Sequence, residues 1–159
     1  NIIKLLKKKG IKGKIVGGYY PYNNELDCIQ ILKKLEKKNY IISLPKIKKN
    51  FQMDFIQWSP KEPLVINKFG IPEPSNGKIK FPNILLIPLL SFDKKLNRVG
   101  YGGGFYDRYI NGIKRKKTPL LIGLAYSFQR VKSIPINRYD KKLDFVVTEK
   151  EIIEWEYYF

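Results

Sequence analysis

The most distinctive motif of the chain is the glycine-rich stretch NRVGYGGGFYDRYI, residues 97–110. Glycine reaches backbone angles closed to other residues, so the main chain of such a run can closely approach a bound group. Successive N–H groups in a tight turn form an anion-binding nest, and a helix that follows adds its own unpaired N–H groups. We therefore predict a phosphate-binding turn leading into a helix, with a turn that merely packs tightly as the alternative. The glycines are Gly100, Gly102, Gly103 and Gly104.

Charged residues flank this glycine turn. Arg98 precedes it and Arg108 follows it, so both can add positive charge beside an anion. Asp107 lies one turn into the predicted helix, where a carboxylate can hold a magnesium ion that bridges phosphates, or can simply compensate the helix dipole. The turn lacks the Lys-Ser/Thr ending of a P-loop and the third glycine of the dinucleotide-binding fingerprint.

Composition limits the class of protein and its chemistry. The chain has 159 residues, 43% of them hydrophobic, which suits one folded domain over residues 1–159. No apolar run reaches the roughly 18 residues of a membrane helix, so we expect no membrane association. The single Cys28 cannot form an internal disulfide, and we expect a cytoplasmic monomer. Without histidine, general acid–base work falls to carboxylates, Lys or Tyr, and any metal would be a hard cation on oxygen ligands.

The net charge of +17 has two interpretations. One is nucleic-acid binding. The other is that lysine fills solvated positions, and we favour it because only five of the 31 basic residues are Arg, the preferred reader of bases and phosphates.

Working outward from the glycine turn, apolar runs alternate with helical patterns. Strands are predicted at residues 14–20, 40–45, 51–58, 83–92, 119–126 and 144–148, the second ended by Pro45. A helix is predicted from Asn24, as its N-cap, to about Lys38, with buried Cys28 on its apolar face. A second helix is predicted over residues 105–113, while residues 151–159 fit either an edge strand or a docking segment. This alternation predicts an α/β three-layer sandwich, with a mainly parallel or mixed central sheet flanked by helices.

Blocks in the same order along most of the chain resemble the 5-formyltetrahydrofolate cyclo-ligase family, also called 5,10-methenyltetrahydrofolate synthetase. The longest is FDKKLNRVGYGGGFYDRYI, residues 92–110. The others are YYPYNNELD, MDFIQW, FGIPEP, IGLAYSFQRV and YDKKLDFVVTE. The resemblance implies an ATP-dependent ligase of one-carbon metabolism that turns 5-formyltetrahydrofolate into 5,10-methenyltetrahydrofolate, with release of ADP and phosphate. Alternatives are a basic nucleic-acid-binding module and a non-catalytic folate- or nucleotide-binding relative.

The resemblance also implies roles for individual residues. It assigns the ATP phosphates to Arg98, Gly100, Tyr101, Gly102, Gly103, Gly104, Phe105 and Tyr106. It assigns the folate to Tyr20, Glu25, Phe69 and residues 101–105, with Glu25 gripping the pterin. Asp107 and Asp140 match magnesium-binding acids, and Arg98, Tyr106 and Asp107 are implied to be catalytic.

Each assignment has a structural alternative. Glu25 could be an ordinary first-turn helix acid, and Tyr20 and Phe69 could be core aromatics. Asp140 could begin a turn, with Asp144 as another magnesium neighbour or a strand-start residue. Trp58 is expected in the core. Glu73 is expected to be exposed or to line the site, without an assigned role.

The sequence departs from the family pattern at three places. The family's N-terminal helix rich in Lys and Arg has no counterpart here, because only NIIKLLKKKG precedes the first predicted strand. We expect that helix to be missing from this chain. Leu96 stands where the family usually has glycine, and Tyr139 stands where histidine is frequent.

Overall fold

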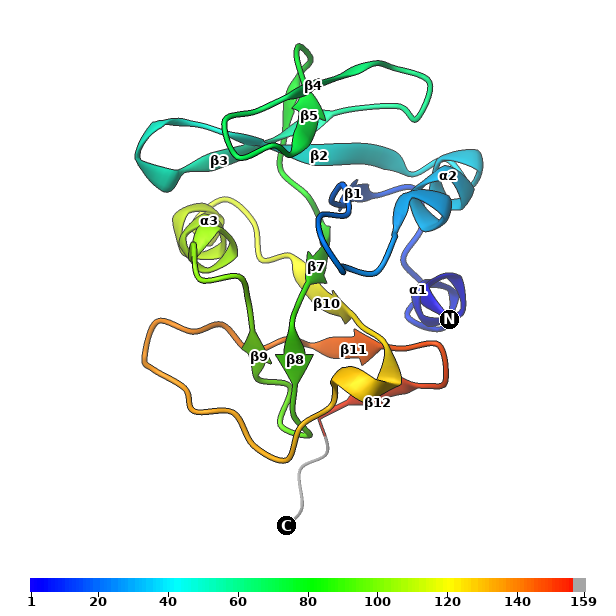
Figure 1. The fold of residues 1–159 in the computed structure, drawn as a ribbon. Helices are drawn as coiled ribbons and strands as arrows, with labels where there is room; N and C mark the ends of the chain where they lie inside the picture. Colours follow the sequence, from blue (N-terminus) through cyan, green and yellow to red (C-terminus); the bar gives the residue numbers. More distant parts are fainter. Residues whose placement is uncertain (156–159) are drawn as a thin grey trace.

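One eight-stranded sheet runs through the computed structural model, which describes residues 1–155 (Figure 1). Five neighbouring strands are parallel: β11 (Phe145–Val147), β10 (Leu120–Leu124), β7 (Ile84–Pro88), β1 (Ile15–Gly17) and β2 (Ile41–Ile47). Antiparallel strands complete the two edges: β12 (Ile152–Glu154) beside β11, and β3 (Met53–Gln57) followed by β6 (Ile79–Lys80) beside β2. The predicted mixed sheet is confirmed.

The central strand explains the layers. Ile84 and Leu86 of β7 belong to one apolar cluster, and Leu85 and Ile87 belong to another on the opposite face. All four are fully buried. Because alternate side chains of a strand point to opposite faces, this continuous apolar run requires cover on both sides.

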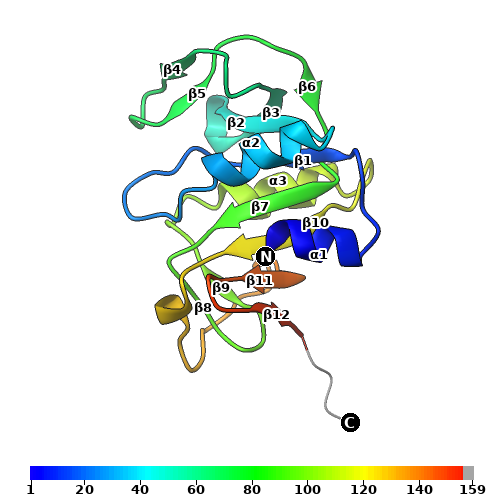
Figure 2. The same cartoon turned by 90° about the vertical axis from the view of Figure 1, so that its right-hand side faces the viewer.

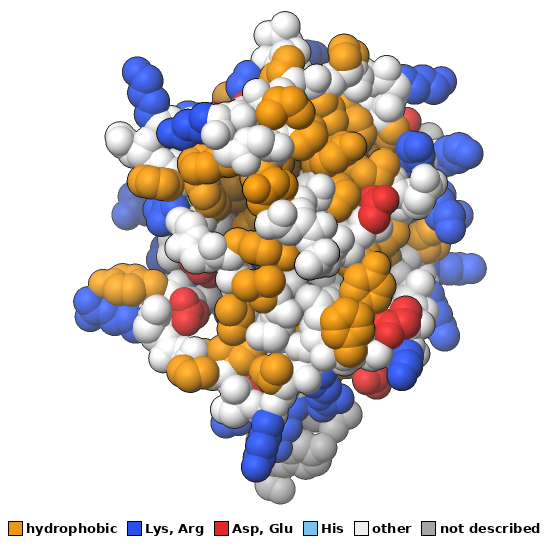
Figure 3. Space-filling view, in the orientation of Figure 1, with side chains coloured by type: hydrophobic (Ala, Val, Ile, Leu, Met, Phe, Trp, Pro, Cys, Tyr) orange, Lys and Arg blue, Asp and Glu red, His pale blue; other side chains and the backbone are white. Residues whose placement is uncertain are grey.

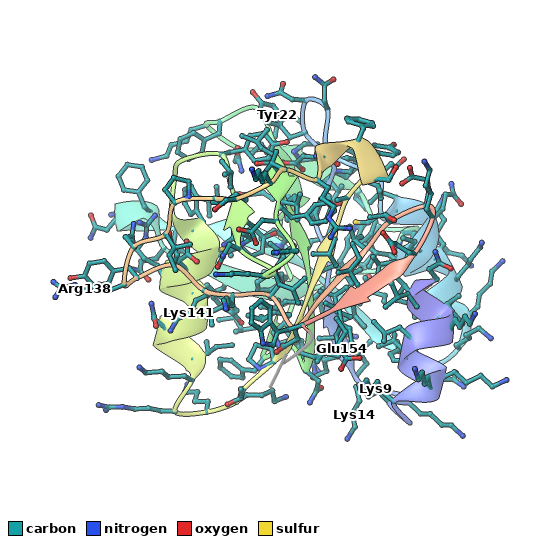
Figure 4. The ribbon with its side chains drawn as sticks, turned by 90° about the horizontal axis from the view of Figure 1, so that it is seen from below. Lys9, Lys14, Tyr22, Arg138, Lys141 and Glu154 are labelled. Atoms are coloured by element: carbon teal, nitrogen blue, oxygen red, sulfur yellow. The ribbon has the colours of Figure 1, made fainter. Side chains whose placement is uncertain are left out.

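Helices supply that cover. Figures 1 and 2 show α1 (Ile2–Lys8) and α2 (Ile29–Lys37) on one face and α3 (Phe105–Ile113) on the other. Helix α3 has the predicted bounds. Because helices cover both faces of the sheet, the three-layer prediction is confirmed. The exposed ends of α1 and β12 are linked by an ion pair between Lys9 and Glu154 at 3.6 Å, labelled in Figure 4.

Short elements complete the chain. Two antiparallel hairpins stand apart from the large sheet: β4 (Leu64–Ile66) with β5 (Pro72–Pro74), and β8 (Ser91–Phe92) with β9 (Arg98–Val99). Two 3-10 turns span Lys49–Phe51 and Ser127–Gln129. No helix within residues 1–155 is both long and apolar enough to cross a membrane.

Three predicted boundaries are wrong. Helix α2 begins at Ile29 with Cys28 as N-cap, because Asn24 and Glu25 belong to a turn in which the amide of Glu25 bonds the carbonyl of Tyr22. Strand β2 continues through Pro45 because only its first part, to Ser43, pairs with β1, so the missing N–H has an open side.

The other differences concern strand ends. The single strand predicted over 83–92 is divided, since β7 ends at Pro88 and the chain turns into β8. In the tail, Ile152–Glu154 forms an edge strand, as one of our two interpretations held. Residues 156–159 lie outside the described part of the chain.

Candidate active site

A cleft of about 1060 Å³ opens where the carboxyl ends of the parallel strands meet. From β1 the chain moves to β2 on one side and later to β7 on the other, which makes the β1–β7 boundary a topological switch point. In open α/β sheets ligands bind at such a point. Every residue that we predicted to act lies in the lining: Tyr20, Glu25, Phe69, Arg98, Gly100, Tyr101, Gly102, Gly103, Gly104, Phe105, Tyr106, Asp107 and Asp140.

The glycine turn begins α3 as predicted. Gly104 is the N-cap of α3 and has φ of 66°, a left-handed conformation that side chains disfavour. Gly102 has φ of 89°, and a Cβ built there would have no atom within 4 Å. The turn therefore presents open backbone at a helix N-terminus, the arrangement that accepts a phosphate.

Arg98 and Asp107 form an ion pair across the base of this turn. Nη2 of Arg98 donates to Oδ1 of Asp107 at 3.1 Å, and the arginine side chain is only 9% exposed. The Nε of Arg98 is buried without a hydrogen-bond partner among residues 1–155. A buried donor without a partner is costly, so this guanidinium is suited to an added anionic acceptor.

Glu25 lies in the cleft with little charge compensation. Its Oε2 accepts from the backbone N–H of Tyr22 at 3.1 Å. Burial raises the pKa of this carboxyl from 4.5 to about 7. Burial, and secondarily the Glu25 charge, also raises the pKa of Tyr106. A carboxylate held this way can accept two neighbouring donors from a ligand, such as those on the amino-pyrimidine edge of a pterin.

Three phenylalanines form one wall of the cleft. The ring of Phe105 lies 6.0 Å from both Phe51 and Phe69, centroid to centroid. Arg108 stacks against Phe51 and Phe105, at 5.7 and 5.4 Å from its Cζ to the ring centroids. This guanidinium also bonds the carbonyls of Phe51 and Gly103, so it connects the glycine turn to the turn before β3.

Sequence reasoning missed Phe51 as a cleft residue. It lies in a left-handed turn with φ of 57°, between lysines and the start of β3. That segment reads as the polar end of a strand, and nothing in the sequence reveals that it meets the glycine turn.

The two predicted magnesium acids line the same cleft. Lys141, next to Asp140, donates its backbone N–H to Oδ1 of Asp107 at 3.1 Å. Asp140 also accepts from the N–H of Asn137, so it does stabilise a turn. Residues 1–155 contain no group of three or more His, Cys, Asp or Glu that could hold a metal. The two carboxylates fit a hard cation only if substrate oxygens and water complete its ligands.

A buried carboxylate that we did not predict shapes the approach to the glycine turn. Asp93 is 2% exposed and accepts from the backbone N–H groups of Lys95, Asn97 and Ile134. Between them Leu96 is fully buried with φ of 62°. Glycine adopts this left-handed conformation without strain, which explains the glycine that the family usually has at this position. In this chain, the hydrogen bonds to Asp93 hold Leu96 in the same conformation.

Several structural alternatives are settled by burial. Tyr20 and Phe69 are 36% and 38% exposed in the cleft, so neither is a core residue. Trp58 and Cys28 are buried as predicted, and the Cys28 thiol, whose pKa burial raises to about 12, donates to the carbonyl of Tyr19. Glu73 is buried outside the cleft lining, contrary to our expectation.

Asp144 lies immediately before β11 and outside the cleft lining. Its Oδ2 accepts from the N–H of Leu121 at 2.8 Å. This is the strand-start role, and it makes Asp144 a poor magnesium ligand.

Solved structures and curated sequences resemble this chain over most of its length. A 5,10-methenyltetrahydrofolate synthetase from Aquifex aeolicus aligns with a TM-score of 0.77 and 28% identity, covering 97% of this chain and 78% of that one. One from Mycoplasma pneumoniae gives 0.69 and 25%, covering 91% and 78%.

The sequences agree with the structures. A 5-formyltetrahydrofolate cyclo-ligase from Haemophilus influenzae is 34% identical over 140 residues, which are 83% of this chain and 74% of that protein. The Escherichia coli K12 protein of the same name is 30% identical over 147 residues, 88% and 80% of the two chains. The model of the 5-formyltetrahydrofolate cyclo-ligase family matches residues 4–149. This chain belongs to the 5-formyltetrahydrofolate cyclo-ligase family.

Proposed function

We propose that this chain converts 5-formyltetrahydrofolate and ATP into 5,10-methenyltetrahydrofolate, ADP and phosphate in the cleft at the ends of β1 and β7. The observation that carries the proposal is that one cleft contains both an open glycine turn and a half-buried carboxylate, Glu25. The first suits a phosphate chain, and the second suits a pterin edge. Membership of the family makes the chain a ligase.

The reaction requires a poor leaving group to be activated. The formyl oxygen attacks the γ-phosphorus of ATP and ADP departs. The neighbouring side-chain N–H nitrogen of the folate then attacks the formyl carbon and releases its proton to water, and the oxygen leaves with the phosphoryl group as inorganic phosphate. Such transfer depends chiefly on positioning and on neutralising charge, which this histidine-free chain can provide.

The residues of the chain have distinct parts in this scheme. We assign the phosphates to the amides of residues 100–104, with Arg98 neutralising charge on the transferred group. We assign Glu25 and the wall of Phe69 and Phe105 to the folate. Asp107 orients Arg98 through their ion pair. With magnesium bound, Asp107 and Asp140 would hold it, and the ion would neutralise phosphate charge.

Substitution of Asp107 tests this proposal. We expect Asp107→Asn to lower turnover about a hundredfold or more, because it removes the charge that orients Arg98 and offers an oxygen to magnesium. The methenyl product absorbs in the near ultraviolet, so its formation is followed by absorbance with and without ATP. Asp144→Asn is the matched control, since its amide oxygen can still accept from Leu121 and it lies outside the cleft lining.

The outcomes separate the hypotheses. Full turnover by Asp107→Asn refutes the role of the Asp107 carboxylate. If only Asp144→Asn loses turnover, the role belongs to Asp144 instead. Ligand binding without any product from the wild-type chain identifies a non-catalytic relative. We still expect a cytoplasmic, single-domain enzyme that is monomeric and does not bind nucleic acid. Sedimentation tests the monomeric state, and titration with RNA at several salt concentrations tests nucleic-acid binding.

A further inference from the structure

We propose that Glu73 is a positioning residue that holds Phe69 in the folate-binding wall through Asn67. The sequence motifs gave Glu73 no role, and its side chain does not line the cleft. The inference rests on the proposed function for its kinetic test, but its geometric part stands independently.

Glu73 is a buried acid that accepts hydrogen bonds from two neutral groups. It lies on β5 and is 7% exposed. Its Oε2 accepts from the backbone N–H of Ile47 on β2 at 3.0 Å and from Nδ2 of Asn67 at 2.9 Å. Burial of a carboxylate is expensive unless its hydrogen bonds are made, so both donors are held firmly.

Asn67 connects Glu73 to the turn that carries Phe69 through its side-chain hydrogen bonds. With its Nδ2 directed at Glu73, its Oδ1 accepts from the backbone N–H groups of Phe69 at 2.9 Å and Ile71 at 3.1 Å. Backbone bonds between Asn67 and Ile71 and from Gly70 to Asn67 close the same turn. One amide side chain therefore organises the whole connection between β4 and β5.

Apolar packing holds this hairpin at its ends near the sheet, where Leu64 packs against the core and Pro74 is buried. Toward the turn, Val65 and Ile66 of β4 are 45% and 66% exposed, so apolar contacts do little to orient the turn itself. Figure 1 shows β4 and β5 beside β2, at one end of the molecule. Phe69 meets Phe105 edge to face, with 79° between the rings. The position of the ring thus depends on the path from Ile47 through Glu73 and Asn67.

Two Glu73 variants test the path. Glu73→Ala removes the acceptor, and we expect the folate KM to rise about five- to tenfold as Phe69 leaves the wall, with the ATP KM unchanged. Glu73→Gln retains an oxygen that can accept both donors, so its folate KM should stay within about twofold of wild type. The matched control is Lys46→Met, which removes the bond from Lys46 on β2 to the carbonyl of Ser75, directly after β5, and leaves Asn67 untouched.

A double-mutant cycle distinguishes positioning from general damage. In the Phe69→Ala background, Glu73→Ala should raise the folate KM no further, since the ring it positions is gone. A full additional five- to tenfold rise in that background, or equal effects of Lys46→Met and Glu73→Ala, would overturn the inference. Asn67→Ala should reproduce Glu73→Ala, which keeps the test valid if the glutamate variant folds poorly.

A readout without catalysis keeps this inference separate from the proposed function. NMR cross-peaks between the Phe69 and Phe105 rings should be present in the wild type and in Glu73→Gln, and lost in Glu73→Ala. Their persistence in Glu73→Ala refutes the positioning role even if turnover is normal. Absence of turnover in the wild type, with the cross-peaks behaving as expected, instead refutes the proposed function.

Discussion

At the scale of single residues, Glu25 shows how burial alone can prepare a group for binding. The chain contains 31 basic side chains, yet Glu25 bonds to a backbone N–H. Within residues 1–155 that N–H is the one hydrogen-bond donor that offsets the loss of water, and the pKa of Glu25 rises to about 7. The carboxylate is ionised at mildly alkaline pH and can then be neutralised by donors on a ligand.

This environment predicts a pH-dependent affinity for folate. The folded pKa of about 7 exceeds the ordinary 4.5, so the free protein is largely protonated at Glu25 below pH 7. If the ionised form grips the pterin, affinity for 5-formyltetrahydrofolate falls about tenfold between pH 8 and pH 6. Fluorescence or calorimetric titration at fixed ionic strength measures this, in the absence of ATP.

Substitution of the carboxyl identifies the titrating group. Glu25→Gln should bind more weakly at pH 8 and show an almost flat profile between pH 6 and pH 8. A wild-type profile that is already flat, or one that stays steep in Glu25→Gln, would show that another group governs binding.

At the scale of elements, the two ends of α3 carry glycines in different structural situations. Gly104 needs a left-handed conformation, with φ of 66°, to turn the chain into the helix. Gly112 lies in the last turn of the same helix, where a Cβ would meet no atom within 4 Å. The backbone conformation therefore favours glycine at position 104, whereas position 112 has room for a larger side chain. The sequence alone does not distinguish the two positions.

Alanine at each glycine separates these effects. We expect Gly104→Ala to lower the free energy of unfolding by about 1–2 kcal/mol, because alanine is strained in the left-handed region. Gly112→Ala should raise it by about 0.5–1 kcal/mol through its better helix propensity. Urea unfolding followed by circular dichroism measures both, and equal effects of the two variants would contradict the assigned geometry of the turn.

At the scale of the whole molecule, the basic charge is mostly unpaired. Residues 1–155 contain four ion pairs, against 31 basic side chains in the chain. In Figure 3, hydrophobic groups gather across the middle of the face shown, while Lys and Arg extend mainly around its outline. Figure 4 shows Arg138 and Lys141 on the loop beside α3, where Arg138 extends outward. Charge so placed repels itself and can attract an anionic substrate toward the centre.

Self-repulsion of this kind predicts stabilisation by salt. Raising NaCl from about 10 to 300 mM shortens the Debye length from roughly 30 Å to below 10 Å, and should raise the unfolding free energy by about 1 kcal/mol or more. Urea unfolding at fixed pH measures the change. Sucrose at matched osmolality is the control for solvent effects, and a free energy that falls or stays constant with NaCl would show that repulsion is unimportant.

Local patterns were enough for much of the fold and the site. The apolar run around Ile84–Pro88 predicted a buried strand, and the glycines followed by Phe105–Ile113 predicted a turn and a helix with the observed bounds. Glycine conformation and strand burial depend on neighbouring residues along the chain, which explains this success. The start of α2 was wrong because the local signal of Asn24 competed with a turn held by Glu25 and Tyr22.

Neighbouring residues along the chain specify the strand–helix alternation and the turn at Gly102 and Gly104, and the family pattern in the sequence names the candidate residues. Three features depend on the folded arrangement: Phe51 and Phe69 both meet Phe105, Glu73 is buried, and the pKa of Glu25 is raised. The reason is physical: backbone preference is a local property, whereas burial, desolvation and contact between distant segments exist only once the sheet has brought those segments together.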